Sequence, residues 1–239
     1  LYRKYFELVP INNISAFQTN GGTNQISFLI PPVQGASLQT SDMVFSGTLT
    51  IFKDDGTVYT QADIGTTDIS MDSVNGAHNL ISRVDIISQG SGNALIEQRR
   101  QYSLINKYRR GTLAKNDLSA GKHNNQGLCS TNSNGVRNFL TADSNNLGHD
   151  FSIQLNTGFL MDNIQQINLG AANGLLVKIY MNEVSNALFS INTTAASKLT
   201  SDFNIQLTNV KLFGRYNFVT APVLSSLTGV QFRKTNDLI

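Results

Sequence analysis

The sequence predicts an all-β protein built as an antiparallel sandwich or barrel, and three observations support this fold class. Short segments that alternate apolar and polar residues recur along the chain, as expected for half-buried strands. Clusters of Gly, Asn, Asp, Ser and Pro separate these segments. No regular strand–helix–strand alternation, which would indicate a parallel sheet, is visible. We expect roughly eight strands, one short helix and long loops.

The first strands are expected in the front quarter of the chain. Residues 24–32 alternate apolar and polar side chains and end in a double proline, which cannot continue strand pairing. Residues 42–59 contain two apolar runs separated by Asp54, Asp55 and Gly56, and Asp-Gly is a signal of a tight hairpin. We therefore expect one strand with a firm end, followed by a strand, a turn and a second strand.

The middle of the chain predicts a strand, a helix and a loop. Residues 80–88 form a short β-branched run, which is typical of a strand. After a Gly-rich break, residues 94–111 are the most charged and most helix-like stretch. Residues 111–148 are rich in Gly, Asn and Ser and almost without periodicity, so they predict a long loop. Loops of that length usually cover or contact something.

Three strands are expected in the last third, at residues 150–159, 174–184 and 202–219. The second is the clearest, since its even-numbered residues such as Leu176 fall on one side and a continuous set of apolar residues falls on the other. The third alternates, breaks step near Asn209 and resumes. Such a break indicates an irregularity within one long strand.

One domain is expected over residues 1–239, because the chain is long enough to bury a single large core. Within it we expect an N-terminal extension at 1–20 and a C-terminal tail at 220–239, where the pattern is weak. A tail of this kind either frays or reaches a neighbouring subunit.

The charge content is low. Charged residues make up 14% of the chain, against about 25% in average soluble domains, and the formal net charge is +2. That charge is too small to indicate a nucleic-acid or membrane partner by itself. The one cysteine, Cys129, excludes an intrachain disulfide. We expect no membrane span, because no run approaches the roughly 18 apolar residues that a span requires.

Nothing in the sequence points to a catalytic, cofactor-binding or metal site, so we expect no enzyme and no cofactor. Adjacent residues of a strand point to opposite faces, so His149 and Asp150 do not form a dyad. Only three glutamates and no tryptophan occur, which weakens the case for a carbohydrate enzyme or lectin. Two sets of residues were considered as metal ligands, and neither has the spacing of a known metal site. They are the histidines His78, His123 and His149, and the aspartates Asp54, Asp55, Asp63, Asp68 and Asp72.

The helix expected at 94–111 has a basic side. At about 100° per residue, an apolar side would carry Leu95, Tyr102, Ile105 and Tyr108, and the opposite side Arg99, Arg100, Lys107 and Arg110. One interpretation, which we favour, is a solvated face over a buried apolar one. The alternative is an interaction patch for a packaged nucleic acid or an acidic neighbour, with a salt-dependent contact.

The order of these elements resembles the viral jelly-roll capsid proteins. More specifically, it is similar to the single jelly-roll penton, or minor capsid, proteins of virophages and polinton-like viruses. The resemblance is one of pattern over most of residues 20–220, without an invariant motif. The stretches that carry it are residues 24–52, 75–110, 175–189 and 203–219.

The resemblance implies a jelly-roll β-sandwich and a structural protein of the virion, made in the host cytoplasm or nucleus. It further implies a homopentamer that closes the five-fold vertices of an icosahedral shell, with contacts to trimeric major capsid proteins, weak contact with the packaged genome and no cofactor. A double jelly-roll major capsid protein would be a considerably longer chain, which favours the vertex protein unless this chain is part of a larger product. The alternatives are a fragment or homologue of a jelly-roll major capsid protein, and a β-sandwich adhesin or carbohydrate-binding module. A β-sandwich hydrolase is the least favoured.

Overall fold

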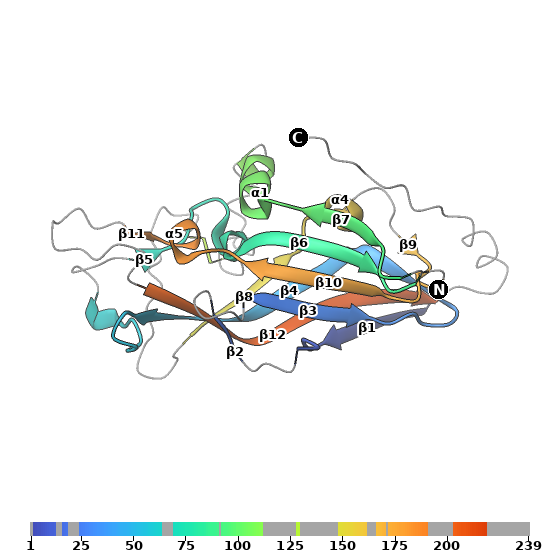
Figure 1. Ribbon diagram of the computed structural model, residues 1–239, viewed down its shortest axis with the longest axis horizontal. Coiled ribbons are helices and arrows are strands. Elements are labelled where there is room, and N and C mark those ends of the chain that lie inside the picture. The colour runs from blue at the N-terminus through green and yellow to red at the C-terminus, as the bar shows by residue number, and fades with distance from the viewer. Residues whose placement is uncertain are drawn as a thin grey trace.

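A computed structural model of the protein describes residues 2–12, 16–18, 24–63, 69–90, 92–111, 128–129, 148–161, 166–170, 172–190 and 203–218. Within these ranges, two antiparallel sheets lie face to face (Figure 1). The expected tail at 220–239 and nearly all of the expected loop at 111–148 lie outside the described residues.

The larger sheet has six strands. Its main path runs in the order β1 (Tyr2–Leu8), β12 (Phe203–Phe218), β4 (Ala36–Lys53) and β8 (His149–Gln154). Two short strands add to it, β2 (Ala16–Gln18) beside β12 and β9 (Gln166–Ile167) beside β4. Residues 1–20 therefore contribute two strands to the sandwich, both paired with β12.

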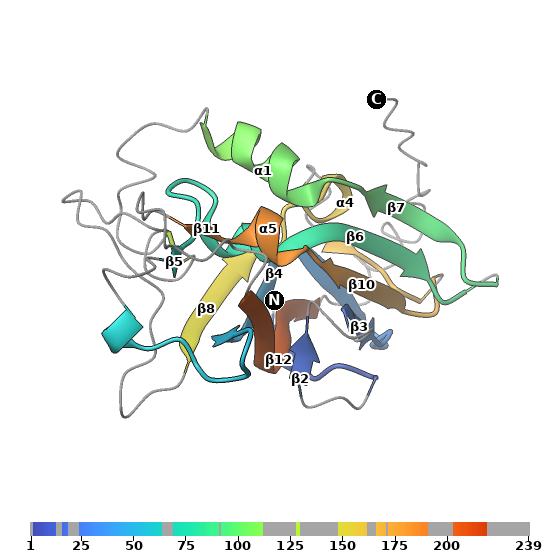
Figure 2. The same cartoon turned by 60° about the vertical axis from the view of Figure 1, so that its left-hand side comes forward.

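The smaller sheet has four strands, in the order β3 (Gln25–Ile30), β10 (Leu175–Met181), β6 (Ile81–Ser88) and β7 (Leu95–Arg99). A separate pair joins β11 (Phe189–Ser190) to β5 (Ile69–Ser70). The helices in the described ranges are α1 (Tyr102–Gly111), α4 (Gly158–Met161) and α5 (Val184–Ala187), with 3-10 turns η1 (Gln61–Asp63) and η2 (Gly76–Leu80). Figure 2 shows α1 following β7 at the margin of the smaller sheet.

The strand pairing is that of a jelly roll. Counted along the chain, the eight strands of the two main paths pair first with last and inward in turn: β1 with β12, β3 with β10, β4 with β8, and β6 with β7. This is the pattern of one long hairpin rolled up into two sheets, and every one of these pairs is antiparallel. The predicted all-β jelly-roll sandwich is confirmed.

The core lies between the two sheets and follows the alternation of their strands. In β10, Leu175, Val177 and Ile179 are buried, while the residues between them are partly exposed, as the sequence predicted. Phe28 of the smaller sheet meets Phe45 of the larger one edge to face, with ring centroids 6.2 Å apart. Fully burying a side chain of this size contributes about 1.5–3 kcal/mol, so such contacts hold the two layers together.

The predicted break in the last strand is confirmed at Asn209. Its φ is +50°, and the register of β12 against β4 shifts between Thr208 and Lys211. Asn tolerates this left-handed conformation better than most residues. The bulge adds one residue, after which Val210 and Leu212 again point into the core.

Two predicted elements differ from the structure. The helix begins at Tyr102 rather than near residue 94, because residues 95–99 form β7 and pair with β6. Pairing at a sheet edge outweighs the weak local preference for helix. The turn predicted around Asp55 is present, but the chain after it forms isolated bridges, such as the one between Phe52 and Val58, instead of a second strand.

Candidate interaction surfaces

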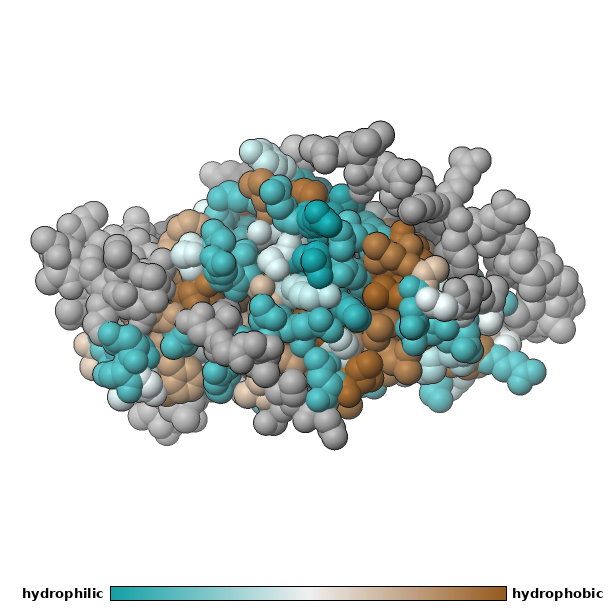
Figure 3. All heavy atoms as spheres, in the orientation of Figure 1, coloured by the Kyte–Doolittle hydropathy of each residue, from teal (hydrophilic) through white to brown (hydrophobic). Residues whose placement is uncertain are grey.

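The outer face of the smaller sheet carries a row of large apolar side chains at one end. Leu29, Leu176, Ile87 and Leu95 are direct cross-strand neighbours over all four strands. Leu29 is 39% exposed and Leu95 47%, and the two between them are half-buried. Figure 3 shows hydrophobic residues gathered over this end of the sheet. We call these four residues the outer apolar row.

The rest of this outer face is polar and largely neutralised within the chain. The neighbouring row places Lys178 beside Asp85. Arg83 lies 3.8 Å above the centre of the Tyr180 ring, and its Nε is 3.3 Å from Asp85 Oδ1. The apolar row therefore interrupts a polar surface. Contiguous exposed apolar residues rimmed by polar ones are typical of protein–protein contacts.

A hollow lies on the outer face of the larger sheet. Its volume is about 370 Å³, and its lining includes Tyr5, Val44 and Phe213 with Asp42 and Gln154. Aromatic residues are enriched at protein interfaces. The two sheets thus present an apolar feature on each outer side of the sandwich.

Helix α1 is attached to the sandwich by asparagine side chains. Asn106 donates to Asn75 Oδ1 at 2.6 Å, and Asn156 donates to Asn106 Oδ1 at 2.6 Å. Asn75 in turn donates to the Ser103 carbonyl at 2.9 Å and to Asn79. Asn75, Asn79 and Asn106 are buried. A buried polar network whose members satisfy one another fixes a single arrangement, so α1 is held in place by geometry as well as by apolar contact.

Tyr102 and His78 belong to the same junction. The Tyr102 hydroxyl is 3.1 Å from His78 Nδ1 and accepts a hydrogen bond from the Asn156 amide at 3.0 Å. Burial raises the pKa of Tyr102 above its usual value, so the phenol stays neutral. These contacts join α1 to η2 and to the segment after β8.

The four basic residues that were expected on one face of the helix lie on different elements and differ in exposure. Arg99 lies on β7 with Nε 3.5 Å from Glu97 Oε1, and Arg100 follows it, exposed, donating to Gln98 at 2.7 Å. On α1, Lys107 pairs with Asp72, whereas Arg110 is only 7% exposed. The helical-wheel geometry fails because the helix begins seven residues after Leu95, at Tyr102. The function of these residues as an interaction patch stays a prediction.

The exposed face of α1 differs from the expected one. Tyr108, placed on the buried side from the sequence, is 73% exposed, and Leu104 and Arg109 are exposed beside it. Counting the wheel from Tyr102 alone would have separated the buried Tyr102 and Asn106 from the exposed Leu104 and Tyr108. Residues 94–96 are apolar and follow a turn, which is typical of the start of a strand. This signal could have shown that the helix does not begin at residue 94.

Glu97 is a buried carboxylate that sequence analysis did not single out. Its two oxygens accept the backbone amides of Gly158 and Phe159, each at 2.8 Å, at the start of α4. Arg99 lies beside it. These contacts join β7 to the segment after β8. The partners are about sixty residues apart in the chain, so no local sequence pattern could have predicted the contact.

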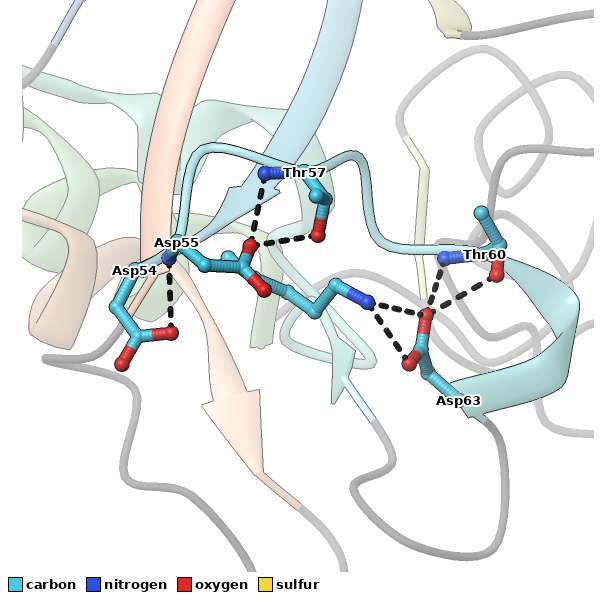
Figure 4. Close-up of polar contacts among 6 residues, drawn as sticks. Asp54, Asp55, Thr57, Thr60 and Asp63 are labelled. Atoms are coloured by element: carbon cyan, nitrogen blue, oxygen red, sulfur yellow. Dashed lines mark hydrogen bonds and ion pairs between the residues drawn. The ribbon is translucent and has the colours of Figure 1, made fainter.

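The acidic residues near the β4 turn are engaged in local hydrogen bonds (Figure 4). Asp55 accepts the Thr57 amide at 2.8 Å and its hydroxyl at 2.6 Å. Asp63 accepts the Thr60 amide at 2.8 Å and lies 3.1 Å from Lys53 Nζ. Burial would raise the pKa of Asp63, but these hydrogen bonds and the lysine lower it overall. The described residues hold no group of three or more His, Cys, Asp or Glu side chains suited to a metal ion, and Asp68 and His123 lie outside them.

Asp72 joins η2 to α1. It accepts the amides of Val74 and Asn75 at 2.9 and 2.8 Å and pairs with Lys107. Burial opposes its ionisation, yet the hydrogen bond from Lys107 and the two amides lower the pKa below the usual value. Close by, Cys129 is buried, and burial raises the pKa of its thiol to about 11, so it stays protonated at neutral pH.

None of the helices in the described ranges combines the length and the apolarity needed to cross a bilayer.

Comparisons with known proteins support the fold. No family model matches the chain, and no curated protein matches it. Among solved structures, the Faustovirus major capsid protein is similar over 94% of this chain and 56% of its own, with a TM-score of 0.56 and 14% identity. A chain in the Sputnik virophage structure is similar over 92% of this chain and 48% of its own, with a TM-score of 0.52 and 12% identity.

The chain spans about half the length of these two solved chains. At such low identity the likeness concerns the fold, which is the jelly roll found in viral capsid proteins.

Proposed function

We propose that the chain is a structural protein of a viral capsid, located in the virion, which builds the shell by subunit contacts and catalyses no reaction. The observation that carries this proposal is the jelly-roll strand order, with a likeness to the Faustovirus major capsid protein over 94% of the chain. The same sandwich serves other functions elsewhere, so the surface has to support the role as well.

The surface is consistent with burial against neighbours. Only 14% of the residues are charged, and charged residues are depleted in the centres of protein interfaces. The outer apolar row on one sheet and the hollow beside Tyr5 on the other offer contact areas on both outer sides of the sandwich. A subunit of a closed shell needs contacts on more than one side.

The finer proposal is that the chain is the penton, a homopentamer that closes the five-fold vertices and contacts the major capsid protein. Its support is the sequence resemblance to virophage and polinton-like penton proteins. It treats residues 1–239 as one domain whose segment at 220–239 reaches a neighbour. The rival within the same class is a fragment or homologue of a jelly-roll major capsid protein.

The mass of the purified protein in solution tests these proposals, measured by light scattering over a range of concentration and salt and followed by electron microscopy. A closed ring of five copies is the expected result. A trimer would favour the major capsid alternative. A monomer at every concentration that binds glycans saturably would overturn the capsid proposal in favour of a carbohydrate-binding module.

Contact with the packaged genome is a separate, weaker component of the proposal. Of the four cations, Arg100 and Lys107 are exposed enough to reach a phosphate, whereas Arg110 is buried. The double variant R100E/K107E should reduce retention of a single-stranded oligonucleotide at low salt, and the reduction should vanish at high salt. The control K4E, at an exposed lysine of β1, should leave retention unchanged if the α1 patch is the site.

A further inference from the structure

Within the part of the chain that the structure describes, strand β1 forms one edge of the larger sheet. Among the described residues it pairs only with β12, along its whole length from Tyr2 to Leu8. Tyr2 is 66% exposed and Tyr5 70%, and Arg3 and Lys4 between them are exposed as well. Figure 1 shows β1 at the lower margin of the sandwich. An edge strand presents unpaired backbone groups, which are a template for pairing with another strand.

The outer face of β1 carries one cation and one anion, and each lies two residues along the strand from the same tyrosine. Arg3, Tyr5 and Glu7 share this face, since residues two apart in a strand point to the same side. Glu7 is 47% exposed at its side chain and makes an ion pair of 2.6 Å with Lys211. Its carboxylate can accept a second cation, because two oxygens are available.

We propose that β1 pairs antiparallel with β1 of a second copy, in a register centred on Tyr5, so that the larger sheets of the two copies become one continuous sheet. Tyr5 then faces the partner subunit's Tyr5 across a two-fold axis. Arg3 faces the partner subunit's Glu7, and by symmetry Glu7 faces the partner subunit's Arg3. The contact is self-complementary, as a two-fold interface requires.

The neighbouring registers lack this match. A register centred on Lys4 places two lysines directly opposite each other, and like charges in that position are destabilising. A register centred on Phe6 places Tyr5 opposite Glu7 and leaves Arg3 without an acidic partner. The charge pattern of β1 therefore selects one symmetric register.

This contact goes beyond the proposed capsid role and does not depend on it. Strand addition at a sheet edge takes its affinity from backbone hydrogen bonds and its register from side chains. A two-fold pair of this kind could join subunits in a shell or exist as a free dimer. A five-fold ring and a β1 pair are separate contacts, so an experiment can support one of these two proposals and contradict the other.

A charge exchange tests the proposal. R3E and E7R should each raise the dimer dissociation constant by about tenfold or more, because each turns both ion pairs into repulsions. The double variant R3E/E7R should restore association, since each copy again offers opposite charges. The internal pair of Glu7 with Lys211 is lost in E7R and stays lost in the double variant. Rescue therefore reports the contact between copies, and a double variant no tighter than the single ones would overturn the proposal.

Cross-linking tests the register directly. Residues directly opposite in an antiparallel pair have Cβ atoms about 4.5–5.5 Å apart, which is close to disulfide reach. Y5C should therefore form a disulfide-linked dimer under mild oxidation. The control Y108C, at the equally exposed Tyr108 of α1, should form much less, and the native Cys129 is buried. Equal cross-linking of Y5C and Y108C would overturn the pairing, and stronger cross-linking of K4C than of Y5C would overturn the register.

Discussion

At the scale of single residues, several buried polar side chains of the protein each meet more than one hydrogen-bond partner. Asn75, Asn106 and Asn156 are linked by amide hydrogen bonds, and Glu97 by two backbone amides. An unsatisfied buried polar group costs more than its hydrogen bond contributes when made. We therefore expect the fold to be sensitive to substitutions of these residues.

Removing the central amide of the network should destabilise the fold. Asn106→Ala leaves Asn75 Oδ1 and the Asn156 amide without their partner, and each unsatisfied group costs about 1–3 kcal/mol. Denaturant unfolding monitored by circular dichroism would measure the loss. Asn186→Ala, at an exposed asparagine of α5, should change stability little. Equal losses for the two variants would contradict a structural role for the network.

The lowered pKa of Asp72 predicts a pH-dependent stabilisation. Because the folded pKa lies below the ordinary value of 3.8, ionised Asp72 stabilises the fold above that value, and the contribution is lost as the pH falls through the folded pKa. Asp72→Asn should therefore be less stable than the natural protein at pH 7, and the difference should shrink in acid. Thermal unfolding at a series of pH values would test this. A difference that persists unchanged below the folded pKa would exclude the charge as its cause.

At the scale of elements, the close fit between β1 and β12 depends on a glycine. Gly214 stands opposite Phe6 in the register of these strands, and a Cβ at this position would meet the Phe6 ring and the Met43 sulfur. Phe6 in turn packs on Tyr216, with ring centroids 4.8 Å apart. The space left by the missing side chain is what lets the edge strand lie flat on the core.

Gly214→Ala should loosen β1 rather than unfold the sandwich. Overpacking of this kind costs about 1–3 kcal/mol, and here the strain falls on an edge strand. Hydrogen exchange should show faster exchange in β1 with little change in β10, which lies in the other sheet. A second substitution, Phe6→Leu, should recover part of the loss, because it shortens the side chain that meets the new methyl group. No recovery would locate the strain elsewhere.

At the scale of the whole molecule, the two outer sides of the sandwich differ from ordinary solvated faces. The outer apolar row crosses all four strands of the smaller sheet, so it is a feature of the assembled sheet and not of any one strand. The fold does not require these side chains to be apolar, because they point away from the core. We interpret the row as a contact for another subunit.

Replacing the exposed ends of the row with charge should impair assembly while sparing the fold. L29K/L95K places two cations in a surface that burial would dehydrate, and an unpaired buried charge strongly disfavours association. Light scattering should show smaller assemblies, with the unfolding midpoint changed little. The control Q25K/Q98K, at two half-buried glutamines in the polar part of the same outer face, should assemble more nearly like the natural protein. Normal assembly of L29K/L95K would show that the outer apolar row is not a contact between subunits.

The sequence predicted strands at β3, β4, β6, β8, β10 and β12, but it did not predict β1 and β7. Alternation in β10 and the break of β12 at Asn209 are local signals, since side chains of a strand alternate with a period of two. The three-dimensional structure was needed to find the strand order, the pairing of residues 95–99 as β7, the burial of Arg110 and the asparagine network under α1. Each of these depends on partners far away in the chain, such as Asn75 for Asn106 and β6 for β7. Which distant segments meet is set by the packing of the whole sandwich, and no local pattern encodes it.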